Sequence, residues 1–316
     1  MKLTRLFAVL AALMLLAVAC SSDATEDDAT ENDAEPTTTA ADGDATETED
    51  TDEEMADAPM AIISLSPTAT EMLYAIGAGD QVLAVDNFSN FPVEAADKMQ
   101  GLSGFEPNVE AIAALEPDLI LTSGTNPEFL AQLDALDIAH WEGPAATNFN
   151  DIYTQIEQLG AATGHVEDAA ELISSMQERV ETATASVPSF QRPITYYHEL
   201  DPTFFSVSPA TFIGSVYTLA GLENIVGADA EAFPQLSQEF IVDADPDMIF
   251  LACTIYCGET AESVATRDGW ADMTAVQSGL VIEMDDDVAS RWGPRTVDYL
   301  EQVVAAVESY ASVDAN

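Results

Sequence analysis

The residues best suited to binding chemistry in this 316-residue sequence are two arginines in the segment 285–295. The chain has 57 acidic residues and only 8 basic ones, so any cation beyond the N-terminus stands out. A guanidinium offers up to five donors in a fixed fork, which suits an anionic or amide-rich ligand. We therefore expect Arg291 to face a ligand. The alternative is that Arg291 or Arg295 pairs with the aspartates at 285–287 and caps the final helix.

A second reactive pair is Cys253 and Cys257, four residues apart. In an exported protein such a pair favours a disulfide, and two thiols without a nearby histidine are weak support for zinc. A redox dithiol stays open as the alternative. The sequence has no Gly-x-Ser-x-Gly elbow, phosphate loop, dinucleotide fingerprint or His-Glu-x-x-His pair. We expect neither an enzyme nor a resident metal or cofactor.

Secondary structure must position these side chains. From residue 61 short apolar runs alternate with amphipathic stretches. Strands are predicted at 61–65, 81–85, 119–122 and 138–141, and helices at 70–76, 108–115 and 128–136. Such alternation predicts an α/β fold with a sheet covered on both faces. A further helix predicted over 166–187, about 33 Å long at 1.5 Å per residue, suits a rigid link between two domains.

The second half of the chain repeats the first. Ser64-Leu-Ser-Pro67 recurs as Ser206-Val-Ser-Pro209, and both Glu110 and Glu239 stand seven residues before a Pro-Asp pair. The proline of the Ser-x-Ser-Pro motif and the proline of the Pro-Asp pair are 50 residues apart in the first half and 37 apart in the second. The second copy therefore lacks about one strand and its loop. We predict two α/β lobes with a central cleft. The N-terminal lobe spans 59–165, one long rigid helix joins the lobes at 166–188, and the C-terminal lobe spans 189–316.

Loops that follow strands are expected to line the cleft, because ligand sites favour domain interfaces. Three of these loops carry Phe88, Phe105 and Phe233. Aromatic rings there would offer flat apolar surface to a ligand. The alternative for each ring is ordinary packing in a core.

The first 58 residues predict export and a tether. Lys2 and Arg5 precede an apolar run that ends at Cys20, as in a secretory signal at 1–20. The run resembles a bacterial lipoprotein signal with Cys20 as the lipidated residue, although Ala17 stands where leucine is usual. Residues 21–58 are mostly Asp, Glu, Thr and Ala, which predicts a disordered acidic tether. We expect a lipid anchor on the outer face of the cytoplasmic membrane; a soluble secreted protein is the alternative.

The acidity of the chain bears on its partners. Of the 57 acidic residues 16 lie in 23–57, which leaves 41 acidic and six basic residues, and a net charge of −35, in 59–316. Binding to nucleic acid needs clustered Lys and Arg, so nucleic acid is not an expected partner. The charge is consistent with salt-rich surroundings, where counter-ions screen repulsion, or with an ordinary acidic exported protein.

Three segments resemble substrate-binding proteins of ABC importers, in the group that binds vitamin B12, haem and iron-siderophores. They are 61–77, 107–120 and Ser290-Arg-Trp-Gly-Pro-Arg295, and the resemblance covers roughly 60–312. It implies a monomer of two lobes with little hinge motion, an ABC permease as partner, and a cobalt or iron chelate as ligand. Two rival hypotheses remain: an exported hydrolase or redox enzyme using the same cleft, and a surface adhesin on an acidic stalk.

The resemblance also implies roles for single residues. Glu110 and Glu239 match the pair that docks onto permease arginines, one on each lobe; the alternative is a carboxylate that only stabilises the first turn of its helix. Phe88 and Phe233 keep the aromatic character of the cobalamin-binding members, and Asp287 and Arg291 match ligand-facing positions. Gly104 and Ser123 stand where those members have tryptophan, which leaves corrinoid, haem and iron-siderophore all open.

Overall fold

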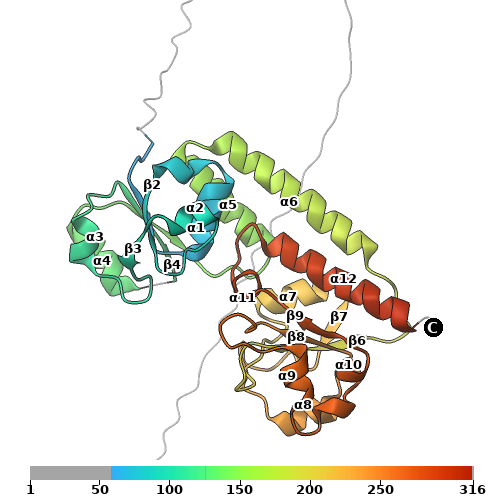
Figure 1. The fold of residues 1–316 in the computed structure, drawn as a ribbon. Helices are drawn as coiled ribbons and strands as arrows, with labels where there is room; N and C mark the ends of the chain where they lie inside the picture. Colours follow the sequence, from blue (N-terminus) through green and yellow to red (C-terminus); the bar gives the residue numbers. More distant parts are fainter. Residues whose placement is uncertain (1–57, 125, 315–316) are drawn as a thin grey trace, which may run out of the picture. The chain divides into compact units, whose positions relative to one another are not determined.

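The computed structural model describes residues 58–124 and 126–314, and a five-stranded parallel sheet forms the N-terminal lobe (Figure 1). Its strand order is β3-β2-β1-β4-β5. The strands are β1 (Ile62–Ser64), β2 (Val82–Asp86), β3 (Met99–Leu102), β4 (Leu119–Ser123) and β5 (His140–Gly143). The central strand β1 is buried along its whole length, as its unbroken apolar run predicts. The sequence did not reveal β3, because this edge strand buries only Leu102 and shows no apolar pattern.

Short helices connect these strands. They are α1 (Pro67–Ala75), the 3₁₀ turn η1 (Ala78–Gln81), α2 (Val93–Ala96), α3 (Val109–Ala113) and α4 (Pro127–Ala135). Helix α1 begins three residues earlier than predicted, because the Ser66 hydroxyl accepts from the Ala69 N–H and Pro67 fits the first turn. The Ser-x-Ser-Pro motif is therefore the strand-to-helix corner of the lobe.

A second parallel sheet forms the C-terminal lobe, in the order β7-β6-β8-β9. Its strands are β6 (Ile194–Glu199), β7 (Leu222–Asn224), β8 (Met248–Leu251) and β9 (Val281–Glu283). In each lobe the first strand lies between the second strand and the strand that follows the Pro-Asp pair. The described residues of the second lobe hold no counterpart of β3, which confirms the repeat and its missing strand.

Short helices also connect the strands of the C-terminal lobe, and a longer one ends the part of the chain that the structure describes. They are α7 (Phe212–Leu219), α8 (Gln238–Ala244), α9 (Ala261–Ala265), the 3₁₀ turn η2 (Trp270–Asp272), α10 (Thr274–Gln277), α11 (Asp286–Ser290) and α12 (Thr296–Asp314). Thr211 caps α7 through the Gly214 N–H, and Ser237 caps α8 through the Phe240 N–H.

Helices α5 (Phe149–Thr163) and α6 (Val166–Ser186) run between the two sheets in sequence. The predicted long helix is α6, which ends one residue early, before Pro188. It packs on α5 and α12 (Figure 1), so it is not a free strut. One apolar core continues from the N-terminal lobe through α6 into the C-terminal lobe. Among the described helices, none is long and apolar enough to cross a membrane.

Candidate functional site

Two adjoining pockets form a cleft between the lobes. One, of about 390 Å³, is walled by the strand-following loops of the N-terminal lobe together with Tyr256 and residues of 287–292. The other, of about 360 Å³, is walled by 145–147, by the start of α7, by Phe233 and by 288–292. Ser290, Arg291 and Trp292 line both pockets, so the last residue of α11 and the two residues after it divide one cleft into two halves.

Aromatic rings stand on both walls of this cleft. Phe88 and Phe105 meet edge to face, with ring centroids 5.7 Å apart, and both line the first pocket. Phe233 lines the second pocket. Phe88 and Phe233 are about half exposed and Phe105 is 80% exposed, so none of the three predicted rings packs in a core. Sequence reasoning missed Tyr256 as a cleft residue, because nothing marked it apart from its place between two cysteines.

Arg291 lies in the cleft wall, but protein acceptors occupy its guanidinium. Nη1 donates to Glu71 and to Asn90 Oδ1, each at 2.9 Å. Nη2 donates to the Phe88 carbonyl at 2.9 Å and pairs with Asp287 at 2.7 Å. The expected pairing with a nearby aspartate is thus present for Asp287, and bonds to the opposite lobe accompany it.

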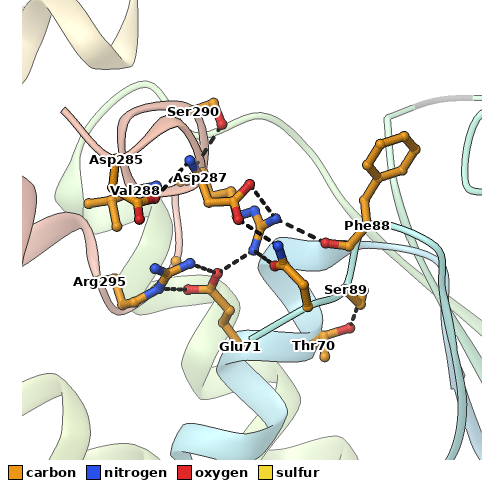
Figure 2. A network of polar contacts seen from close by, with 12 residues as sticks. Thr70, Glu71, Phe88, Ser89, Asp285, Asp287, Val288, Ser290 and Arg295 are labelled. Carbon is orange, nitrogen blue, oxygen red and sulfur yellow. Dashed lines mark hydrogen bonds and ion pairs between the residues drawn. The ribbon is translucent and has the colours of Figure 1, made fainter. Parts of the chain in front are cut away.

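Glu71 on α1 joins the lobes through two arginines, and no pattern in the sequence marked it. Its carboxylate accepts from Arg291 and also from Arg295, whose Nε and Nη2 donate at 2.9 and 2.5 Å (Figure 2). The alternative pairing of Arg295 with 285–287 is wrong, because its hydrogen bonds go to a residue 224 positions away. The side chain of Glu71 is 2% exposed, and those of Arg291 and Arg295 are 9% and 17% exposed. The Arg295 guanidinium also lies 4.1 Å from the ring centroid of Phe91.

Two carboxylates face the first pocket. Asp86 ends β2 and is almost wholly buried; burial raises its pKa, while hydrogen bonds from the Ser89 hydroxyl and the Phe88 N–H oppose that rise. The hydroxyl of Thr70 contacts the hydroxyl of Ser89 and so extends this series of hydrogen bonds (Figure 2). Asp287 accepts from Asn90 Nδ2 at 2.7 Å, across the lobes. Sequence reasoning named Asp287 and missed Asp86.

The two glutamates of the repeat occupy equivalent places. Glu110 lies in the first turn of α3, two residues after its cap Asn108, and Glu239 lies in the first turn of α8, two residues after its cap Ser237. Both side chains are exposed and lie on different lobes. Each carboxylate also interacts favourably with the helix dipole.

Three further expectations concern the cysteines and metals. Cys253 and Cys257 are joined by a disulfide. Cys20 lies outside the described residues. In residues 58–124 and 126–314 no three His, Cys, Asp or Glu side chains gather as a metal site.

Comparison with known proteins finds similarity to periplasmic and substrate-binding proteins. The model of a family described as periplasmic binding protein matches residues 62–288. The chain is 28% identical over 257 residues to the uncharacterised ABC transporter substrate-binding lipoprotein YvrC of Bacillus subtilis, covering 79% of this chain and 80% of YvrC. It is 29% identical over 259 residues to a cobalamin-binding protein of Halobacterium salinarum, covering 78% and 69%. The crystal structure of the periplasmic vitamin B12-binding protein BtuF of Vibrio cholerae superposes with a TM-score of 0.69 at 28% identity, covering 80% and 98%.

Proposed function

The chain belongs to the periplasmic binding protein family, and from this premise we propose that it captures a cobalamin-type corrinoid outside the cytoplasm and delivers it to an ABC importer. Membership of the family makes the chain a non-enzymatic substrate-binding component of an ABC transporter. A small metal chelate is the class of ligand, and the cleft between the lobes is the place to bind it.

The charge of the cleft is the observation that carries the choice of a corrinoid. Among the described residues lining the two pockets, the charged ones are Asp86, Asp287 and Arg291. Arg291 is already paired with Glu71 and Asp287, so the cleft has no positive charge to spare for an anion. A ligand carboxylate 5 Å from one of these aspartates would be repelled by about 3 kcal/mol at an effective dielectric constant of 20.

The rim of a corrin ring avoids this repulsion. It carries neutral amides, whose N–H groups can donate to carboxylates such as Asp86 and Asp287. The flat apolar faces of the ring suit the exposed rings of Phe88, Phe105 and Phe233. Haem, by contrast, has two propionates. The cobalamin-binding relatives from Halobacterium and Vibrio support the same choice.

Delivery and anchoring complete the proposal. Glu110 and Glu239 are exposed, equivalent and on different lobes, so each can form an ion pair with a permease arginine. Cys20 is proposed as the lipidated residue that holds the protein at the outer face of the membrane. Stable anchoring requires more than one acyl chain, which a lipoprotein cysteine carries.

Calorimetry against cyanocobalamin, haemin and ferrichrome tests the ligand. We expect cyanocobalamin to bind one to one, at least tenfold more tightly than haemin at low salt. Raising the salt should strengthen haemin binding by screening its repulsion, and should leave cyanocobalamin binding nearly unchanged. Tighter binding of haemin at low salt would contradict the assignment to a corrinoid.

A further inference from the structure

The loop between β8 and α9 holds an unusual pair of exposed apolar side chains. The Cys253–Cys257 disulfide closes it, and within it Ile255 and Tyr256 are each 63% exposed. Only Tyr256 of the two lines the cleft. A short closed loop that exposes apolar surface calls for an explanation, because burial would be favourable for both side chains.

Asp286, at the start of α11, fixes the conformation of this loop. Its buried carboxylate accepts from three successive backbone N–H groups, those of Thr254, Ile255 and Tyr256, at 2.7, 3.0 and 2.9 Å. The Thr254 hydroxyl also lies 3.0 Å from Asp286 Oδ1, and its shorter hydrogen bond, at 2.7 Å, goes to the Met284 carbonyl. Bonds to an ionised acceptor are roughly twice as strong as neutral ones, so the carboxylate holds the backbone of the loop firmly.

The far end of the loop is held by a partly buried ion pair. Glu259, two residues after Cys257, pairs with Arg267 at 2.7 Å. Arg267 also makes a two-pronged contact with Glu199, which ends β6, at 2.6 and 2.7 Å. The loop is therefore tied to the C-terminal lobe at both ends and across its middle. A ligand that contacts it has little loop entropy to remove.

Tyr256 is also oriented toward the cleft. Its hydroxyl donates to Asp287 Oδ1 at 3.3 Å, which directs the polar end of the ring toward the contact between the lobes. The same pocket is bordered on the N-terminal lobe by Phe88, Phe105 and the small residues Gly104 and Ser123. Gly104 cannot take a side chain, because a Cβ there would lie 2.3 Å from the Leu65 carbonyl oxygen. Gly104 itself therefore offers no side chain to a ligand, and Tyr256 adds an aromatic ring to this pocket from the C-terminal lobe.

We propose that Tyr256 is a specificity-determining contact for the chelate, with the disulfide and Asp286 as the frame that positions it. This role rests on the proposed function of the cleft. The ring of Tyr256 contacts the apolar surface of the chelate on the C-terminal lobe, while Phe88 and Phe105 contact it on the N-terminal lobe. Asp286 is a positioning residue in this scheme and touches no ligand.

Variants of the loop test the proposal, with cyanocobalamin as the first probe and affinity and melting temperature as readouts. Tyr256→Ala should weaken binding at least tenfold, and Tyr256→Phe, which keeps the ring, by less than threefold. Ile255→Ala is the matched control, equally exposed on the same loop but outside the pocket, and should stay within twofold of wild type. Removing the disulfide by Cys253→Ser with Cys257→Ser should weaken binding about fivefold.

A double variant separates positioning from general stability. Asp286→Asn should weaken binding about fivefold in the wild-type background and by less than twofold in the Tyr256→Ala background, because the frame then has no ring to position. Equal losses in both backgrounds would show that Asp286 acts on the fold as a whole and would remove it from the proposal.

The outcomes also separate this inference from the choice of ligand. If Tyr256→Ala binds as tightly as wild type, the role of Tyr256 is wrong even though the corrinoid assignment stands. If haemin or ferrichrome binds and cyanocobalamin does not, the corrinoid assignment is wrong, and the same variants measured with the chelate that binds decide on Tyr256. If none of the three binds, both proposals fail.

Discussion

Replacing Glu71 by Gln should reveal how much of the stability depends on the contact between the lobes. The change keeps the size of the side chain and removes its charge. Three hydrogen bonds reach this carboxylate, one from Arg291 and two from Arg295. Arg291 keeps Asp287 as a partner in the variant, whereas the hydrogen bonds described for the Arg295 side chain all go to Glu71.

The expected cost follows from burial. Each hydrogen bond to a charged group contributes about 1.5–3 kcal/mol, and the Gln carbonyl can still accept one or two of the three. The guanidinium of Arg295, 17% exposed, then loses the carboxylate that accepts its hydrogen bonds, and breaking a largely buried pair in this way costs about 3–5 kcal/mol. For a protein of this size that loss corresponds to a fall in melting temperature of roughly 6–20 °C.

Urea unfolding at pH 7 measures the effect, with a surface ion pair as the control. Arg179 on α6 donates to Asp298 and Glu301 on α12 at 2.5–2.9 Å, but all three side chains are at least 40% exposed. Arg179→Gln should therefore cost less than about 1 kcal/mol, since exposed pairs contribute little.

Two results would refute this reasoning. If Glu71→Gln lowers the free energy of unfolding no more than Arg179→Gln does, burial of the pair between the lobes does not add to stability. A second arm replaces both partners with apolar residues, Glu71→Leu with Arg295→Met, and should recover at least half of the loss, because no buried charge is left unpaired. A double variant less stable than Glu71→Gln would show that the charges themselves hold the lobes together.

Three further predictions concern docking, anchoring and pH. Reversing Glu110 and Glu239 to Arg should abolish uptake while ligand affinity stays within threefold, about 0.7 kcal/mol; an equal loss of binding would place them in the cleft. Cys20→Ser should release the protein from membranes and remove the mass of the lipid, and unchanged fractionation would exclude the anchor. Burial lowers the pKa of His198 to about 3, so below pH 6.5 the unfolded chain binds the proton preferentially and native stability falls by about 1.4 kcal/mol per pH unit. His198→Gln should lose this slope between pH 6.5 and 4.5, and parallel unfolding curves for the two proteins would contradict the assignment.

Much of the architecture could be predicted from local patterns. The apolar runs of β1, β4 and β8 mark strands buried on both faces. The first Ser-x-Ser-Pro motif marks a helix start that its own Ser66 caps, whereas the second motif precedes a helix that Thr211 caps. The unequal intervals between repeat markers predicted one strand fewer in the second lobe, as the sheet orders confirm. These features follow from residues close together in the chain, which is why the sequence reveals them.

The aromatic walls of the cleft were predicted only in part. Phe88, Phe105 and Phe233 follow strands, so the rule that loops at strand ends line the cleft was enough to select them. Tyr256 obeys the same rule after β8, but its exposure depends on the disulfide and on Asp286, 30 residues further along. Tyr256 lines the cleft only because the conformation of its loop is fixed. The residues that fix it are not all in the loop, so the sequence of the loop does not reveal them.

The partners of the buried charges were decided by the tertiary structure alone. Among 57 acidic residues nothing singles out Glu71, which meets Arg291 and Arg295 across 220 and 224 positions of sequence. The sequence left open, as the alternative to an Arg291 that faces the ligand, that these arginines pair with the aspartates beside them; Arg291 does so with Asp287, and Arg295 does not. The folded chain prefers Glu71 for Arg295 because burying a carboxylate is tolerable only when cations and hydrogen-bond donors surround it. Which cations come within reach of a given carboxylate is fixed by how the two lobes pack, not by their order in the chain.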